Sequence, residues 1–141
     1  TAVLVGPRGY IGKYRKMYLP THSVFEEKRY FRPGYETPVF ETELGKIGLI
    51  ICYDVFFPEV SRALKLKGAQ IIVCISASPA VRRNFFETLT AARAIENNAF
   101  LAYVNLLELR KDIRHIAAFI PTVRDLRPEL YEKLKDEVEK V

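Results

Sequence analysis

The sequence contains few of the residue types that would reveal a metal site or a disulfide framework. Tryptophan is absent, methionine occurs once and cysteine twice among 141 residues. The two cysteines have neither CxxC nor CxxH spacing, which argues against a structural zinc site. Both lie in apolar runs that are typical of strands, so we expect reduced thiols and a cytoplasmic protein. The surplus of lysine, arginine and glutamate beside so little methionine would suit a thermophile.

Long apolar runs are lacking as well. No run reaches the roughly 18 residues that a membrane-spanning helix needs, and no charged-then-apolar leader opens the chain, so we expect no membrane partner and no secretion. The net charge of +5 raises the question of a nucleic-acid partner. We expect none, because the basic residues are scattered among acidic ones and segment 127–140 alternates in sign like a solvated helix face.

The hydrophobic pattern predicts a single α/β domain with a mixed sheet. Two antiparallel hairpins are expected first, one from 1–5 and 10–19 around the turn Gly6–Gly9, the other from VFET, ELGK and IGLIICY. A loop from Pro20 to Gly34 separates them. Helices and strands then alternate, and they are expected at Pro58–Gly68, Ile71–Ala77, Arg82–Asn97, Phe100–Asn105, Leu107–Ile116 and Arg127–Lys140. The apolar side expected for the helix at 82–97 consists of Phe85, Leu89, Ala92 and Ile95.

The position of Cys52 in the sequence makes it a candidate nucleophile. It follows the buried strand IGLII and precedes YDVFFPEV, which opens a helix. A thiol at such a turn faces backbone N–H groups that can hold an oxyanion, and the helix dipole favours a thiolate. A small core residue would fit the same position, so position alone leaves both interpretations open. Cys74 lies in the middle of IIVCISA, where a core role is expected.

Charged residues that could assist the thiol come earlier in the chain. Lys16, in KYRKMYLP, would stabilise a thiolate or the charge of a tetrahedral intermediate, although a solvated edge strand would also explain it. Glu26 and Glu27 lie in the loop, where one of them could orient the lysine, and an exposed carboxylate is the simpler interpretation of Glu26. His22 is another candidate general base. His115 lies in a charged helix and is interpreted as a surface residue, and the sequence lacks the Gly-Ser-Cys-Trp context of papain-like proteases.

Six segments resemble, in the same order, sequence blocks of the nitrilase superfamily of carbon–nitrogen hydrolases. GKYRKMYLP is similar to the lysine motif, usually YRKxHLP, and GLIICYDVFFPE is similar to the cysteine motif, usually GxxICYDxRFPE. The other similar blocks are EKRYFRPG, SASP at 76–79, ARAIENNAFLAYVN and RDLRPELY. Each block is short, but their ordered recurrence covers most of the chain. The sequence is therefore identified as a member of this superfamily, of an amidase-like branch.

The resemblance implies an αββα sandwich with mixed sheets and a Glu–Lys–Cys triad that needs neither cofactor nor metal. It assigns Cys52 as the nucleophile and Lys16 as the catalytic lysine. Glu27 matches the second, auxiliary glutamate of the family. The backbone N–H of Tyr53 would join Lys16 in stabilising the oxyanion.

The chain departs from the family pattern in four ways. Phe56 replaces the usual arginine of RFPE, and Tyr18 replaces the usual histidine of HLP. The general-base glutamate of the triad normally lies well before the lysine motif, and the sequence begins after that point. Further strands normally follow Asn105, whereas here an LRK-like segment follows directly. We therefore expect residues 1–141 to form one carbon–nitrogen hydrolase domain that lacks the N-terminal part and an internal segment after Asn105.

The function expected from this resemblance is hydrolysis of a non-peptide carbon–nitrogen bond through a cysteine thioester. Amide or carbamoyl substrates are favoured over nitriles, because the amide branches of the family are broader. Two alternatives stay open, a glutaminase-type domain that supplies ammonia to a synthetase and a catalytically inactive interaction module. The resemblance also implies a homodimer or larger homo-oligomer. The stripe of Leu130, Leu134 and Val138 would suit such an interface, or would dock onto the chain's own core.

Overall fold

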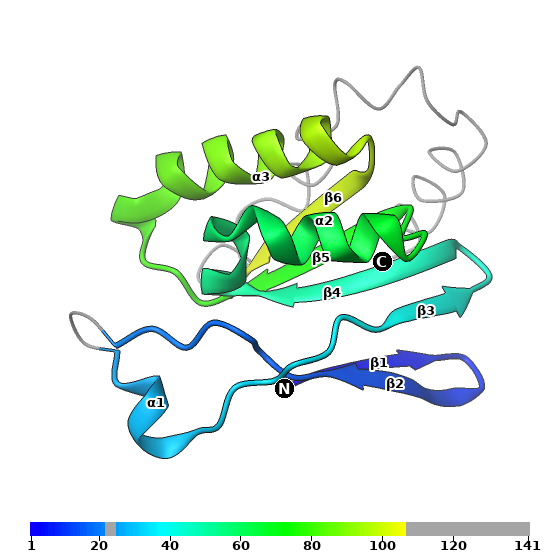
Figure 1. Ribbon diagram of the computed structural model, residues 1–141, viewed down its shortest axis with the longest axis horizontal. Helices are drawn as coiled ribbons and strands as arrows, with labels where there is room; N and C mark the ends of the chain where they lie inside the picture. The colour runs from blue at the N-terminus through cyan, green and yellow to red at the C-terminus, as the bar shows by residue number, and fades with distance from the viewer. Residues whose placement is uncertain (22–24, 107–141) are drawn as a thin grey trace.

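The computed structural model describes residues 1–21 and 25–106, which form three layers (Figure 1). Helices cover one face of a four-stranded sheet, and a separate two-stranded hairpin covers the other face. The strands are β1 (Ala2–Gly6), β2 (Gly9–Tyr14), β3 (Val39–Thr42), β4 (Gly45–Ile51), β5 (Ile71–Ser76) and β6 (Phe100–Asn105). The helices are α1 (Glu27–Tyr30), α2 (Pro58–Leu66) and α3 (Arg83–Asn97), with 3₁₀ turns η1 (Cys52–Phe56) and η2 (Ala80–Arg82).

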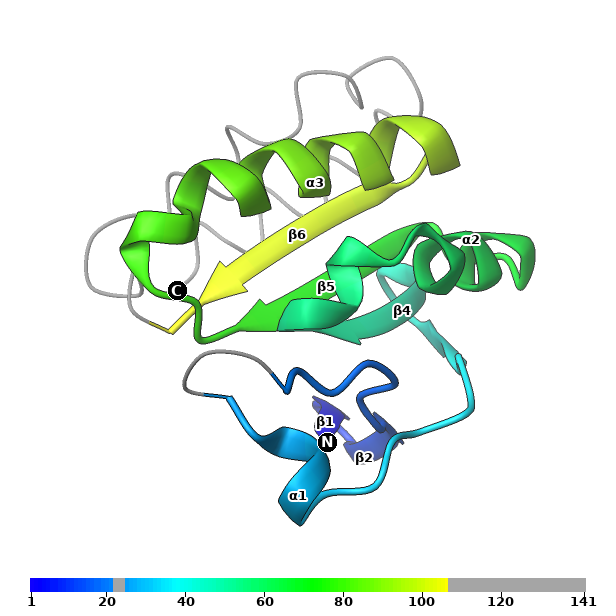
Figure 2. The same cartoon turned by 60° about the vertical axis from the view of Figure 1, so that its left-hand side comes forward.

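The larger sheet has the strand order β3-β4-β5-β6 and is mixed, as expected. β3 and β4 form the predicted antiparallel hairpin, whereas β4–β5 and β5–β6 are parallel pairs joined by α2 and α3. In parallel strands joined by helices the carboxyl ends lie at one edge of the sheet, where α/β proteins place their sites. Here that edge carries the ends of β4, β5 and β6 (Figure 2).

Side chains alternate between the two faces of the sheet because the side-chain period of a strand is two. Ile50, Ile72 and Cys74 pack under the helices, where Val60 and Leu64 of α2 join them. The opposite face carries Ile47, Leu49, Ile71 and Phe100, which pack with Ala2 and Tyr14 of the hairpin. Helix layer, sheet and hairpin thus follow the order α, β, β of the sandwich that the resemblance implies. No helix within the described ranges is long and apolar enough to cross a membrane.

The segment between the two hairpins differs from its prediction. β2 ends at Tyr14, which pairs with Ala2 near the start of β1, so the residues after Tyr14 have no strand opposite them. Lys16 consequently lies beyond the strand rather than on it. The predicted loop 20–34 also contains the short helix α1.

The predicted apolar side of α3 was right for Leu89, which packs against the core, but wrong for Phe85 and Ile95. Phe85 and Ile95 are 64% and 62% exposed, and the buried residues of α3 are Phe86, Thr90, Arg93, Ala94 and Asn97. Three of these are polar, and each donates hydrogen bonds that lower the cost of its burial, although Asn97 Oδ1 has no partner within the described residues. Thr90 Oγ1, for example, donates to the carbonyl of Phe86 at 2.7 Å. A hydropathy pattern alone does not reveal such partners.

Several predictions lie outside the described residues. They are the helices at 107–116 and 127–140, the two histidines His22 and His115, and the stripe of Leu130, Leu134 and Val138. The homo-oligomer that this stripe would support stays a prediction.

Candidate active site

Cys52 lies where β4 ends and the 3₁₀ turn η1 begins. Its backbone has φ 47°, in the left-handed region that residues other than glycine rarely adopt. Such a conformation persists only where the surrounding structure holds it. The sharp turn places the partly exposed thiol at the carboxyl edge of the sheet, as the sequence predicted.

A cleft of about 450 Å³ opens beside this turn. It is lined by the ends of β4, β5 and β6 and by the segment before β3: Lys16, Phe25, Glu27, Ile51, Cys52, Ile75, Ser76, Ala77, Val104 and Leu106. Its volume falls in the range of small-molecule sites. The structure therefore brings Cys52, Lys16 and Glu27 to the wall of one cleft, although the lysine and the cysteine are 36 positions apart in the sequence.

Lys16 is held by Glu27. Its Nζ donates to both carboxylate oxygens at 2.8 Å, and the two side chains are only 10% and 26% exposed. Charge-assisted bonds of this length fix the ammonium in one place. Glu26 is 60% exposed and pairs with Arg29 at 3.1 Å, in agreement with its interpretation as a surface carboxylate.

Backbone hydrogen bonds fix the segment that carries Lys16 and Glu27. The backbone N–H of Gly34 donates to the carbonyl of Lys16 at 2.8 Å, and that of Glu27 donates to the carbonyl of Pro20 at 3.0 Å. A Cβ at Gly34 would lie 2.3 Å from the carbonyl oxygen of Arg15. The Pro-Gly signal of the sequence thus marks a close approach of two backbones, which only glycine allows.

Asp54 organises the site, although it is not among the site residues predicted from the sequence. Its carboxylate is fully buried and accepts hydrogen bonds from the Tyr14 hydroxyl at 2.7 Å and from the backbone N–H groups of Tyr18 and Ile51, both at 2.9 Å. Burial raises the pKa of Asp54 above its ordinary value, and the bonds from the two backbone N–H groups act against this shift. Burial and the charge of Asp54 likewise raise the pKa of Tyr14, so its hydroxyl remains a donor. One side chain thereby joins β2, the Lys16 segment and β4 to the turn of Cys52.

Tyr18 and Phe56, the two residues that depart from the family motifs, pack against other aromatic rings. Tyr18 stacks on Phe57 with ring centroids 3.5 Å apart and planes 7° apart. Phe56 packs edge-on against Phe86 of α3 at 5.5 Å and lies 5.3 Å from the ring of Tyr53. The residues that replace histidine and arginine therefore stabilise the surroundings of η1 through their rings.

The remaining predicted positions are placed as follows. Tyr53 is the second residue of η1, and the oxyanion role of its backbone N–H stays a prediction. Cys74 is fully buried under the helices, in agreement with a core role, and burial raises its pKa above the ordinary thiol range. Both cysteines are free. Within the described ranges, no group of three or more histidine, cysteine, aspartate and glutamate side chains is arranged to hold a metal ion.

Comparisons with known proteins match the chain to a family model and to several relatives. The family model described as carbon-nitrogen hydrolase matches residues 1–117. The chain is 42% identical to a glutamine-dependent NAD(+) synthetase from Aquifex aeolicus, over 75% of the chain and 19% of that protein. It is 43% identical to a nitrilase from Pyrococcus abyssi, over 71% of the chain and 36% of that protein. The chain thus spans well under two thirds of the length of these relatives.

A solved structure gives the same comparison in three dimensions. It is that of a glutamate-to-glutamine mutant of the amidase from Nesterenkonia sp. AN1, showing covalent addition of the acetamide moiety of fluoroacetamide at the active site cysteine. The likeness has a TM-score of 0.57 and 35% sequence identity, and covers 69% of this chain and 36% of that one.

Proposed function

The chain belongs to the carbon–nitrogen hydrolase family, and we propose that it is the cysteine-bearing part of an enzyme that hydrolyses small amides or carbamoyl compounds. The observation that carries this proposal is the arrangement of Cys52, Lys16 and Glu27 around one cleft at the carboxyl edge of the sheet. A nucleophile at a strand end, a fixed cation beside it and a cleft of small-molecule size are what acyl transfer to a thiol requires.

In the proposed reaction the Cys52 sulfur attacks the carbonyl carbon of the substrate. The ammonium of Lys16 and the backbone N–H of Tyr53 stabilise the negative oxygen of the tetrahedral intermediate. Ammonia or an amine leaves with a proton, and a thioester forms on Cys52. Water then attacks the thioester, which releases a carboxylic acid and restores the thiol.

The thiol needs a base that takes its proton and later activates the water. A protonated Lys16 cannot accept that proton, and Glu27 is engaged with Lys16 through both oxygens. We therefore propose that the base is a glutamate of the whole protein that precedes Thr1, and that Glu27 acts as the auxiliary carboxylate that orients the lysine.

The substrate class rests on the chemistry of the relatives. The acetamide adduct at the cysteine of the Nesterenkonia amidase supports a nucleophilic cysteine on this fold, and the description of that protein as an amidase favours amide substrates. The identity to the Aquifex synthetase favours a second candidate, a glutaminase-type domain that supplies ammonia to a synthetase. Both candidates use the same thioester, and they differ in whether glutamine is the acyl donor.

Mass spectrometry of the intact full-length protein tests this proposal. We expect that soaking with a panel of simple amides, carbamoyl compounds, nitriles and glutamine adds an acyl mass on the peptide of Cys52. Cys52→Ala should abolish the adduct, and Cys74→Ala should leave it unchanged. A preferred adduct from glutamine would select the glutaminase candidate. An adduct that persists in Cys52→Ala, or no adduct and no turnover with any compound, would overturn the proposal and favour an inactive interaction module.

A further inference from the structure

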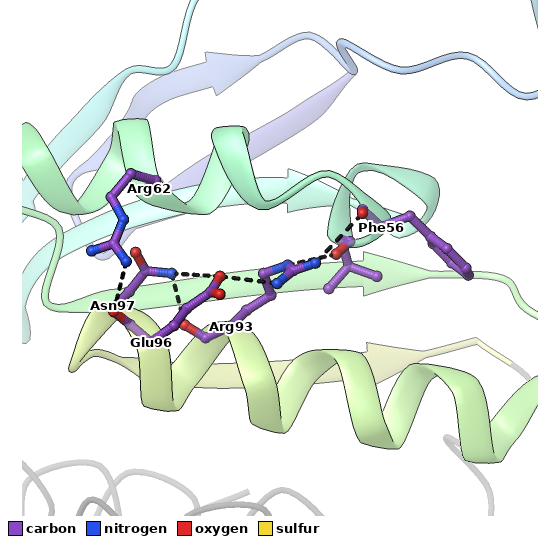
Figure 3. Close-up of polar contacts among 6 residues, drawn as sticks. Phe56, Arg62, Arg93, Glu96 and Asn97 are labelled. Atoms are coloured by element: carbon purple, nitrogen blue, oxygen red, sulfur yellow. Dashed lines mark hydrogen bonds and ion pairs between the residues drawn. The ribbon is translucent and has the colours of Figure 1, made fainter.

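A buried arginine on α3 reaches the turn that carries Cys52 (Figure 3). Arg93 Nε donates to the carbonyl of Val55 at 3.0 Å, and Nη2 lies 3.5 Å from the carbonyl of Phe56. These two carbonyls are the last of η1, where a short 3₁₀ helix has no partners of its own for them. The guanidinium therefore supplies hydrogen bonds that the turn cannot make internally.

The guanidinium is itself held in a fixed position. The side chain of Arg93 is 9% exposed, and its Nη1 donates to Glu96 Oε1 at 2.9 Å. Asn97 Nδ2 donates to the carbonyl of Arg93 at 2.8 Å and to Glu96 Oε1 at 3.3 Å. Figure 3 shows these groups lying together between α3 and the turn. A buried cation with its counter-ion on the next helical turn and its other donors on η1 is a rigid fork rather than a mobile surface charge.

The turn needs such external support. Cys52 holds a left-handed backbone, which is unfavourable for a residue with a side chain. The carboxylate of Asp54 ties η1 to β4 and to the Lys16 segment. Arg93 ties the other end of the same turn to α3. The two buried charged residues thus hold η1 from opposite sides.

We propose that Arg93 is a positioning residue for Cys52. By holding the carbonyls of Val55 and Phe56 it keeps η1 in the one conformation that directs the thiol into the cleft. This inference rests on the proposed function only in taking Cys52 as the nucleophile. A displacement of about 1 Å at a reacting atom can slow a reaction roughly 100-fold, so a turn that is released at one end should lose rate rather than affinity.

The test uses Arg93→Met, which removes both bonds, and Arg93→Lys, which keeps the charge but cannot span two carbonyls. We expect alkylation of Cys52 by iodoacetamide to slow at least about 10-fold in both variants, with a shifted pH profile. On any amide that the protein hydrolyses, kcat should fall while KM changes little.

Two control variants separate positioning from mere stability. Arg62 Nη2 donates to the carbonyl of Glu96 at 2.8 Å across the α2–α3 contact but does not touch η1 (Figure 3). Arg62→Met should therefore leave the alkylation rate and its pH profile at wild-type values. Leu64→Ala should lower Tm through a cavity in the same core and leave the reactivity of Cys52 unchanged in the folded protein.

Wild-type alkylation in folded Arg93→Lys would overturn the inference, even if Arg93→Met fails to fold. Equal slowing in Leu64→Ala would also overturn it, because any loss of stability would then suffice. Alkylation needs no substrate. If the wild-type protein turns over no amide, the proposed function fails while the assignment of Arg93 is still decided by the alkylation rates.

Discussion

At the scale of single residues, the contact between Lys16 and Glu27 limits what can replace the lysine. Both carboxylate oxygens bind one Nζ, so the charge is concentrated at a point 2.8 Å from each. Arginine would carry its charge in a larger planar group that cannot occupy that point. We expect Lys16→Ala to abolish turnover and Lys16→Arg not to restore it, with circular dichroism showing an intact fold. Lys13→Arg, on the exposed face of β2, is the matched control. Near-normal activity in Lys16→Arg would mean that local positive charge alone is sufficient.

The sequence identified the residues that touch the cleft but not the residues that hold them. The resemblance to the family blocks implied roles for Cys52, Lys16 and Glu27, but none for Asp54 and Arg93, which lie in two of the same blocks. Asp54 and Arg93 are charged, so a hydropathy pattern assigns them to the surface. Their partners lie far along the chain, because Asp54 and Tyr18 are 36 positions apart and Arg93 and Val55 are 38 positions apart. Burial of such groups is acceptable only because of these partners, and only the folded chain brings them into contact.

At the scale of elements, the base of the loop that carries Lys16 depends on one glycine. A Cβ at Gly34 would lie 2.3 Å from the backbone carbonyl oxygen of Arg15. Either the backbone around Gly34 or the Lys16 segment must therefore move in a variant with a side chain at this position. We expect Gly34→Ala to destabilise the protein by about 1–3 kcal/mol and to lower kcat by displacing the ammonium of Lys16. Thermal unfolding and steady-state kinetics together measure both effects.

A second glycine variant controls for the loss of stability. Gly68 has φ 94° just after α2 and lies away from the cleft, so Gly68→Ala is strained without affecting Lys16. It should lower Tm while kcat stays near the wild-type value. If both variants lose activity in proportion to Tm, the loop base has no specific role in placing the lysine.

Strands could be predicted from the sequence where an apolar run had the length of a strand. β4, β5 and β6 are apolar runs of strand length, and the pattern predicted each of them and a mixed sheet. The pattern failed in the segment after Tyr14, where tertiary hydrogen bonds to Gly34 and Asp54 take the place of a strand ladder. It also failed for part of the face of α3, since Thr90, Arg93 and Asn97, which donate hydrogen bonds, share the side that faces the core.

At the scale of the whole molecule, a buried thiol is expected to make the free energy of unfolding fall at alkaline pH. The Cys74 thiol has an ordinary pKa of 9.0, which burial raises in the folded protein. Above pH 9 the unfolded chain loses this proton and the folded protein keeps it, so the free energy of unfolding falls as pH rises. We expect Cys74→Ala to make this fall shallower by up to about 1.4 kcal/mol per pH unit. Urea unfolding of both proteins between pH 8 and 10.5 measures it, and parallel curves would contradict the assignment.

The long span of the contacts around η1 has a consequence for how the protein is made. A loop must close before a distant contact can form, and a chain emerges from the ribosome N-terminus first. The strand before Cys52 and the turn after it are therefore synthesised well before Arg93, which lies on the last helix of the described chain. Until α3 docks, the carbonyls of Val55 and Phe56 lack the hydrogen bonds that Arg93 donates to them. Under the proposed role of Arg93, a nascent chain that ends before α3 would carry Cys52 on a turn that lacks the support of Arg93, and the proposed nucleophile would be positioned only after α3 has folded onto the sheet.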